Sequence, residues 1–434
     1  MRLSSNRIAI DSCTIGIFLF LGFVLPAYLY FGTKDLSTIR NVGYIICCIF
    51  SFVVMLDFLQ KKKSLTLFCH LLVFFLFSVL THLVIARVVY QIVSSENDII
   101  GMSYCIFSLI IGTRINEISN HKIFKFVVYL VWCLIGFFVF ASFNPVSFQS
   151  VYGTEDAMFS GAYQYIGDTF GFVSILLIFQ ELELIKFLSE KFYLARKLKI
   201  ERAIVKNSIV ISTRILLLII LSIVTLLASN IILFANSSRA SFFSFVVFTI
   251  YIGIIIIRNK EIPYSRLQLS AFILILISFI GFYLLYDNRT ISNFNADIFL
   301  SNRNLELFSS DSSSSLDERI LQGEAGKEDI INSPIFGNYI HRVIDRGPGT
   351  YMHNTMQIAQ DFGIPSFISL WGLIAYCIDH LLKSSRSKKN NYSTMVFNSL
   401  LIFSIVQLVC FRNPVGFYVI YINFGMILRE QLYP

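Results

Sequence analysis

Long apolar runs separated by short polar segments dominate the pattern along the 434-residue chain. A helix needs about 20 apolar residues to cross a hydrocarbon core of about 30 Å. The pattern therefore predicts an all-α polytopic membrane protein with about 10–12 transmembrane helices. The runs lie near residues 8–30, 42–59, 65–86, 98–113, 123–142, 166–188, 209–234, 240–257, 267–286, 364–382, 393–411 and 415–428. The fourth and twelfth runs are short, so they are tilted, re-entrant or merged with neighbours.

Two polar connections between the runs are longer than the rest. They divide the chain into residues 1–286, with nine spans and a smaller aromatic loop at 143–165, a large and partly helical loop at 287–363, and C-terminal spans at 364–434. A long loop in an otherwise compact protein usually carries function. A functional site is therefore expected in the large loop.

The stretch ILQGEAGKEDIINSPIFGNY in the large loop has the periodicity of an amphipathic helix. Ser333 and Pro334 are expected to end it, and Asp317 to cap its start. The side expected to pack inward holds Ile320, Leu321, Ile330 and Ile331, and the side expected to face water holds Glu324, Lys327 and Glu328.

Composition and charge fix the class and the orientation. The chain is 56% hydrophobic and 14% charged, which excludes soluble and disordered classes. With both termini inside, roughly two thirds of the Lys and Arg residues fall on inner segments, which places the large loop outside. The net charge of +8 then reflects this topology and not nucleic-acid binding. The first run lacks a small-residue cleavage signature, so it is expected to be a retained anchor.

The sequence offers no metal-binding pattern. All eight cysteines lie in or beside the apolar runs, where they are expected to be small apolar filler. No Asp-x-Asp pair occurs, so arginines are expected to hold a diphosphate, if one binds, in place of a metal. The outer acids are expected to be solvated or paired; they include Glu155, Asp156, Asp168, Asp297 and Asp345.

Arginines on the outer side are the candidate anion ligands. Arg239 lies in a very short turn between two long runs, where its guanidinium either grips a phosphate or caps the end of a span. Arg87 ends the third run and has the same two interpretations, and Arg319 either lies on the helix surface or binds a ligand. Arg346 completes the first group, and a second group holds Arg289, Arg303, Arg342 and Arg412.

The stretch GPGTYMHNTMQIAQDFGIP places polar residues where an apolar run begins. Helical spacing puts His353, Gln357 and Gln360 on one face. A histidine at this border is either an interfacial packing residue or a general base, since an imidazole can accept a proton near neutral pH. Gly363 and Pro365 are expected to separate a short polar helix from the span that follows.

Three segments together resemble the O-antigen ligase and O-antigen polymerase superfamily of bacterial inner membranes: SSRASFFSF, DIINSPIFGNY and MHNTMQIAQDFGIPSFISL. The resemblance covers mainly residues 236–370. Ala240 stands where the family usually has a glycine.

The resemblance implies an inverting, metal-independent glycosyltransferase without a cofactor, acting on the periplasmic face. Its donor would be a glycan on undecaprenyl diphosphate. Arg239 and Arg319 match family arginines that bind the diphosphate, with Arg87 and Arg346 as further candidates, and His353 matches the family base. Candidate acceptor or glycan contacts are Asn354, Gln357 and Tyr152, and a candidate partner is a polysaccharide chain-length regulator.

Three functions stay open. A polymerase would join repeat units on the lipid carrier, and a ligase would transfer the finished glycan to lipid A-core. The Phe- and Ile-rich composition and the aromatic 143–165 loop favour the polymerase. A flippase for the same lipid-linked unit is the alternative from another class, but charged residues within the runs are sparse and the sequence has no internal repeat of 20 to 50 residues.

Overall fold

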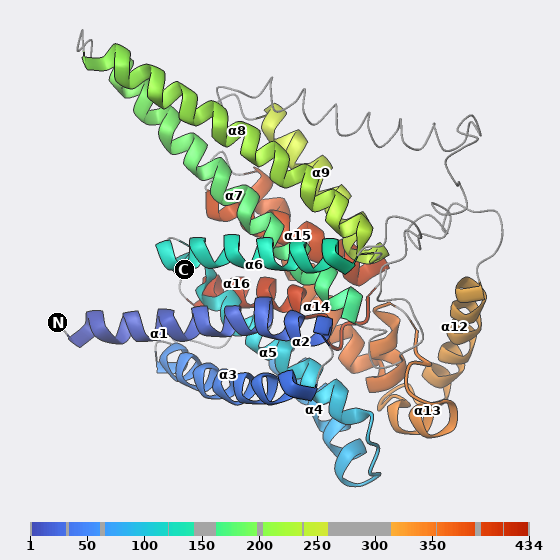
Figure 1. Ribbon diagram of the computed structural model, residues 1–434. Helices are drawn as coiled ribbons and strands as arrows, with labels where there is room; N and C mark the ends of the chain where they lie inside the picture. The colour runs from blue at the N-terminus through green and yellow to red at the C-terminus, as the bar shows by residue number, and fades with distance from the viewer. Residues whose placement is uncertain are drawn as a thin grey trace, which may run out of the picture. The chain divides into compact units, whose positions relative to one another are not determined.

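The computed structural model describes residues 2–31, 34–60, 66–119, 121–142, 162–197, 203–236, 238–258, 314–352, 354–386, 392–410 and 412–432, and every regular element in these residues is a helix (Figure 1). The helices of the first half are α1 (Arg2–Leu19), the π-helical turn η1 (Phe20–Val24), α2 (Leu25–Phe31), α3 (Lys34–Gln60), α4 (Leu67–Val88), α5 (Ser95–Ile118), α6 (Lys122–Ser142) and α7 (Ala162–Lys197). Those of the second half are α8 (Ala203–Ala235), α9 (Arg239–Arg258), α12 (Ser314–Asn332), α13 (Tyr339–Arg346), α14 (Met356–Arg386), α15 (Tyr392–Cys410) and α16 (Tyr418–Leu432).

The all-α polytopic membrane fold is confirmed. Each predicted apolar run coincides with a helix, apart from 267–286, which lies outside the described residues. Seven helices in the described ranges are long and apolar enough to cross a membrane. The fourth run, short by sequence, belongs to the 24-residue helix α5, because polar residues at both ends extend it.

The chain forms two compact units, Met1–Phe124 with Phe308–Pro434, and Lys125–Leu307. The first unit therefore combines helices from both ends of the sequence. This grouping differs from the division by sequence order, because α14 packs on α4 and α16 packs on α5.

Small residues allow the helices of the first unit to approach closely. Gly112 of α5 and Gly425 of α16 face each other's backbone, and a Cβ atom on either would overlap a carbonyl oxygen of the other helix. Between α4 and α14, the hydroxyls of Ser78 and Ser366 lie 2.7 Å apart, and Ser369 donates to the Leu71 carbonyl. Small residues and hydroxyl hydrogen bonds are the usual way in which helices associate in a membrane.

A partly buried charge network joins α1, α5 and α16 at one end of the first unit. Arg114 donates to Asp11 at 2.5 Å and lies 2.8 Å from Glu117, which also accepts from Arg429 at 2.6 Å. The network therefore brings the N-terminal part of α1 and the C-terminal ends of α5 and α16 together.

Polar contacts also join the helices of the second unit. Trp132 of α6 donates to Ser174 of α7 and Ser229 of α8, and Thr225 of α8 donates to Glu181 of α7 at 2.9 Å. Hydrogen bonds of this kind between spans add specificity to packing that is otherwise apolar.

Candidate functional site

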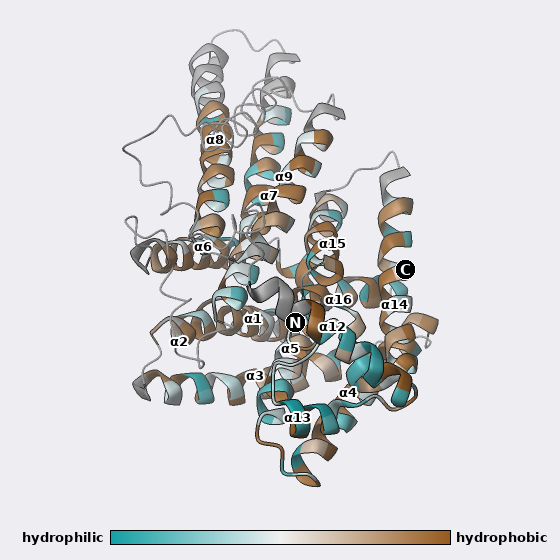
Figure 2. Ribbon diagram, turned by 90° about the vertical axis from the view of Figure 1, so that its right-hand side faces the viewer, coloured by the Kyte–Doolittle hydropathy of each residue, from teal (hydrophilic) through white to brown (hydrophobic). Residues whose placement is uncertain are grey.

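The segment from α12 to the start of α14 is the most polar part of the first unit. Figure 2 shows hydrophilic residues on α13 and hydrophobic residues along most of α14. The polar residues are nevertheless largely buried, because they bond to one another. We call the group Asp329, Arg342, Gln357, Gln360 and Asp361 the polar cluster.

The helix α12 contacts α14 through a polar side, contrary to the prediction. Ile320, Leu321 and Ile331 are 55%, 64% and 76% exposed, whereas Gly326 and Asp329 are buried. Gly326 leaves room for the Met352 side chain. Glu324, Lys327 and Glu328 are exposed, as predicted. The inward side was wrong for Ile320, Leu321 and Ile331, because the hydrogen-bond partners of Asp329 decide which side of α12 faces the protein.

The limits of α12 were predicted in part. The helix ends at Asn332, before Ser333 and Pro334, which confirms the expected stop. It begins at Ser314, so Asp317 lies inside the helix and the prediction that it caps the start was wrong. The serine run before Asp317 continues the helix by a further turn.

Asp329 binds three side chains from outside its own helix. Its Oδ1 accepts from Asn338 Nδ2 at 2.6 Å, its Oδ2 accepts from Gln360 Nε2 at 2.7 Å, and Arg346 donates to the same Oδ2. These bonds connect α12 with α13 and α14. Asp329 is therefore the residue that holds the three helices together.

Arg342 and Asp361 form the buried ion pair of the cluster. The guanidinium donates through Nε at 2.6 Å and Nη2 at 3.1 Å, and the Gln357 amide donates to the same carboxylate at 2.9 Å. Arg342 Nη1 and Gln357 Oε1 are buried and lack a hydrogen-bond partner within the described residues. A buried donor and acceptor of this kind can bind a further polar group.

Aromatic side chains cover the cluster. Tyr339 stacks on Phe362 with ring centroids 5.7 Å apart and donates to Asp98 of α5 at 2.6 Å. The Arg342 guanidinium lies over the Tyr339 and Tyr351 rings, at 5.4 and 5.7 Å. Burial raises the pKa of Tyr339 well above its ordinary value, and the Asp98 carboxylate adds to this effect. Tyr339 therefore stays protonated and keeps its role as a donor.

A backbone kink separates the polar start of α14 from its apolar remainder, as the sequence predicted. Gly363 has φ 85° and ψ 164°, a conformation that only glycine adopts easily. The Ile364 amide donates to the Pro334 carbonyl at 2.8 Å, and the Asn338 amide to the Gln360 carbonyl at 2.7 Å. These two bonds connect the turn between α12 and α13 to the backbone on either side of Gly363.

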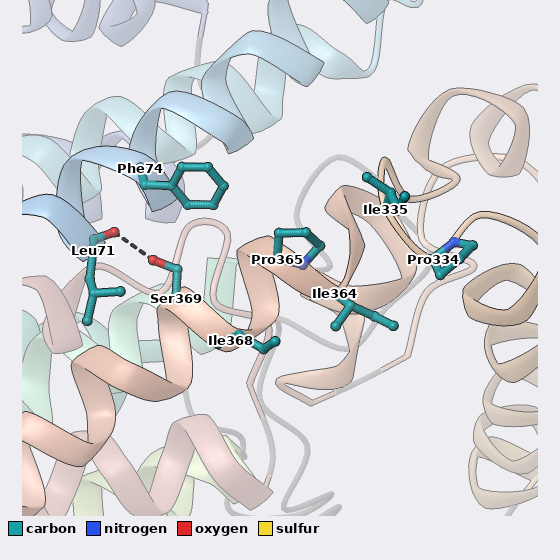
Figure 3. A pocket seen from close by; sticks show the side chains of 8 residues that line it. All are labelled: Leu71, Phe74, Pro334, Ile335, Ile364, Pro365, Ile368 and Ser369. Atoms are coloured by element: carbon teal, nitrogen blue, oxygen red, sulfur yellow. Dashed lines mark hydrogen bonds between the residues drawn. The ribbon is translucent and has the colours of Figure 1, made fainter.

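An apolar groove of about 510 Å³ opens beside this kink (Figure 3). Leu71 and Phe74 of α4 line one side, and Pro334 and Ile335 line another. The remaining lining residues belong to α14 and are Ile364, Pro365, Ile368 and Ser369. The groove offers a hydrocarbon surface directly next to the buried polar cluster.

Four of the predicted site residues have described side chains, and each of them is bound to a neighbour within the protein. Arg87 pairs with Glu96, and Arg346 pairs with Asp329. Asn354 Oδ1 accepts from the Met356 amide at 2.8 Å, and Gln357 binds Asp361.

The other predicted site residues are only partly described. Arg239 begins α9 and Arg319 lies within α12, but their side chains fall outside the described part of the structure, as do His353 and Tyr152 entirely. Met352 and Asn354, the chain neighbours of His353, are both described and both held by hydrogen bonds.

Sequence reasoning missed the residues that organise this region. Asp98, Asp329 and Asp361 were not singled out, Arg342 was placed in the second group, and no helix was predicted over Tyr339–Arg346. The signal for Asp361 was present, since an aspartate that follows two glutamines at a span border needs a cationic partner. Among the outer acids expected to be solvated or paired, Asp168 is buried and accepts from Ser241 at 2.6 Å.

In the described residues, no three His, Cys, Asp or Glu side chains lie close enough to hold a metal ion. No protein-family model and no curated protein matches this chain. A function for the protein therefore has to be inferred from the site and from the sequence pattern.

Proposed function

We propose that this protein is a glycosyltransferase that joins lipid-linked oligosaccharide repeat units, an O-antigen polymerase, on the periplasmic face of a bacterial inner membrane. The observation that carries the proposal is the set of hydrogen bonds on the two chain neighbours of His353, just before the kinked span α14: the Met352 N–H donates to Gln360 of the polar cluster, and Asn354 accepts from the Met356 N–H. A rigid backbone at a membrane border is what a base acting on a lipid-linked sugar requires.

The proposed reaction is a single displacement. An acceptor hydroxyl attacks the anomeric carbon of the donor sugar, His353 takes the hydroxyl proton, and the bond from that carbon to the diphosphate oxygen breaks. Undecaprenyl diphosphate leaves with the bonding electrons. Arg239 and Arg319 are proposed to bind the diphosphate, since donors aimed at the growing negative charge lower the barrier. Arg87 and Arg346 are weaker candidates, because each already pairs with a carboxylate.

The apolar groove supports a lipid-linked donor. Its lining from α4, α14 and the turn before α13 is almost wholly apolar, and it lies beside the polar cluster. A donor with a prenyl tail needs an apolar surface next to a polar one, and we assign the tail to this groove.

The test is the lipopolysaccharide of a strain that lacks the gene, resolved on a gel, with analysis of its undecaprenyl-linked glycans. Core with a single repeat unit, restored to a ladder by wild type but not by His353→Ala or Arg239→Ala, supports the polymerase. Bare core with long polymer on the carrier indicates the ligase. Bare core with unpolymerised units retained inside indicates the flippase and overturns the proposal, as does a full ladder from both variants.

A further inference from the structure

The Gln360 amide lies between two groups of opposite hydrogen-bonding character. Its Nε2 donates to Asp329 Oδ2 at 2.7 Å, and its Oε1 accepts from the Met352 N–H at 3.0 Å. A carboxylate only accepts and a backbone N–H only donates, so one of the two amide orientations satisfies both. Gln360 is 0% exposed, so bulk water cannot replace either bond.

Met352 is held by its side chain as well as by its backbone. Gly326, one turn before Asp329 on α12, lies directly against the Met352 side chain, and a Cβ atom there would overlap it. On the other side of His353 in the chain, the backbone carbonyl of Asn354 accepts from the backbone N–H of Gln357 at 3.1 Å. Both chain neighbours of His353 are therefore fixed to the polar cluster.

We propose that Asp329 is a positioning residue for glycosyl transfer: it sets the orientation of the Gln360 amide, which holds the backbone of Met352, the residue that precedes the proposed base in the chain. The inference rests on the proposed function. In this assignment Asp329 and Gln360 touch no substrate, and their contribution passes through the backbone of residue 352.

The decisive variant is Gln360→Glu. It keeps an acceptor for the Met352 N–H but replaces the donor to Asp329 Oδ2 by a second carboxylate, so this hydrogen bond is lost and Arg346 is left as the donor to that oxygen. Because a shift of about 1 Å at a catalytic group costs about 100-fold in rate, we expect kcat to fall by about 10-fold or more, with KM within about 2-fold.

The double variant Asp329→Asn with Gln360→Glu should restore the activity. The amide introduced at position 329 then donates to the carboxylate introduced at position 360, and that carboxylate takes over from Asp329 Oδ2 as the acceptor for Arg346. The second oxygen of that carboxylate accepts from the Met352 N–H, so the two hydrogen bonds are rebuilt with the amide and the carboxylate exchanged. We expect kcat within about 3-fold of wild type. Asp329→Asn alone should cost less than Gln360→Glu, because the Asn338 amide can reverse to face it.

The matched control combines Gln360→Glu with Glu328→Gln. Glu328 is the exposed neighbour of Asp329 on α12, so this change removes the same charge without the hydrogen bond. It should leave kcat as low as Gln360→Glu alone. Rescue by both partners equally would mean that the net charge matters and not the amide, and it would overturn the inference.

The assay uses the full-length protein in membrane vesicles with lipid-linked repeat units, and size-exclusion chromatography checks folding. Wild-type kcat in folded Gln360→Glu, or a folded double variant no more active than Gln360→Glu, overturns the inference. If Gln360→Glu does not fold, the variant that combines it with Asp329→Asn must be folded and active. The variant that combines it with Glu328→Gln must not be. If the wild-type protein shows no transfer, the proposed function fails. If the wild-type protein is active, His353→Ala is inactive and Gln360→Glu is as active as wild type, only this inference fails.

Discussion

Arg342 and Asp361 form a bidentate ion pair in which both side chains are almost completely buried, at 2% and 0% exposure. The two residues are 19 positions apart and belong to α13 and α14. The pair therefore attaches α13, a helix of only eight residues, to the start of a membrane span.

Removal of one partner from this pair should destabilise the protein strongly. Asp361→Asn leaves the Arg342 charge buried without a counter-charge, and such changes cost about 3–5 kcal/mol. Thermal unfolding in detergent measures the effect. The control is Asp379→Asn in the exposed Lys383–Asp379 pair on the same helix, where we expect a change below about 0.5 kcal/mol. Similar midpoints for the two variants would contradict the importance of the buried pair.

Gly363→Ala tests the kink. The residue has φ 85° and faces the Ile335 carbonyl, so a Cβ atom there is strained and also overlaps backbone. We expect a loss of about 2 kcal/mol or more in unfolding free energy. Gly323→Ala on α12 is the control, since a Cβ there meets nothing within 4 Å; helix propensity should raise stability by up to about 1 kcal/mol. A tolerated Gly363→Ala would mean that the span does not need the kink.

The apolar groove can be tested without unfolding the protein. Ile335 is 62% exposed and lines the groove, so Ile335→Asn should leave the unfolding midpoint unchanged. If the donor's prenyl tail lies there, KM for the lipid-linked donor should rise about 5-fold or more, because apolar contact area is lost. Ile320→Asn, at 55% exposure on α12 and outside the groove lining, should not change KM. Equal KM values for both variants would remove the groove from the proposal.

Tyr339 should make stability depend on alkaline pH. Its pKa is raised by burial and by Asp98, so its contribution to stability is fully present below about pH 10, the ordinary pKa of tyrosine, and is lost as pH rises further. Unfolding midpoints between about pH 9 and 11 should fall less steeply for Tyr339→Phe than for wild type. The same variant should cost about 1–3 kcal/mol at neutral pH, because Asp98 loses its donor. Parallel pH curves would exclude this role for Tyr339.

The amino-acid sequence by itself determined the membrane class, the positions of the apolar helices that the structure describes and the break before residue 364. These features depend on local properties, namely runs of apolar residues, and Gly and Pro at a helix boundary. The same local information placed the end of α12 at Asn332. Pro334 has no backbone N–H to donate and disfavours helical geometry at Ser333, the residue before it.

Only the tertiary structure decided which side of α12 faces the protein and which arginine is buried. Hydrophobicity favoured Ile320, Leu321 and Ile331 as the inward side, but the partners of Asp329 come from α13 and α14, and their positions are set by contacts far along the chain. Arg342 and Arg346 are the same residue type, four positions apart on α13. Arg342 nevertheless lies 2.6 Å from Asp361 in the buried interior, whereas Arg346 is partly exposed and binds Asp329. A buried polar group is stabilised by its specific partners, and partners distant in sequence become neighbours only when the chain folds.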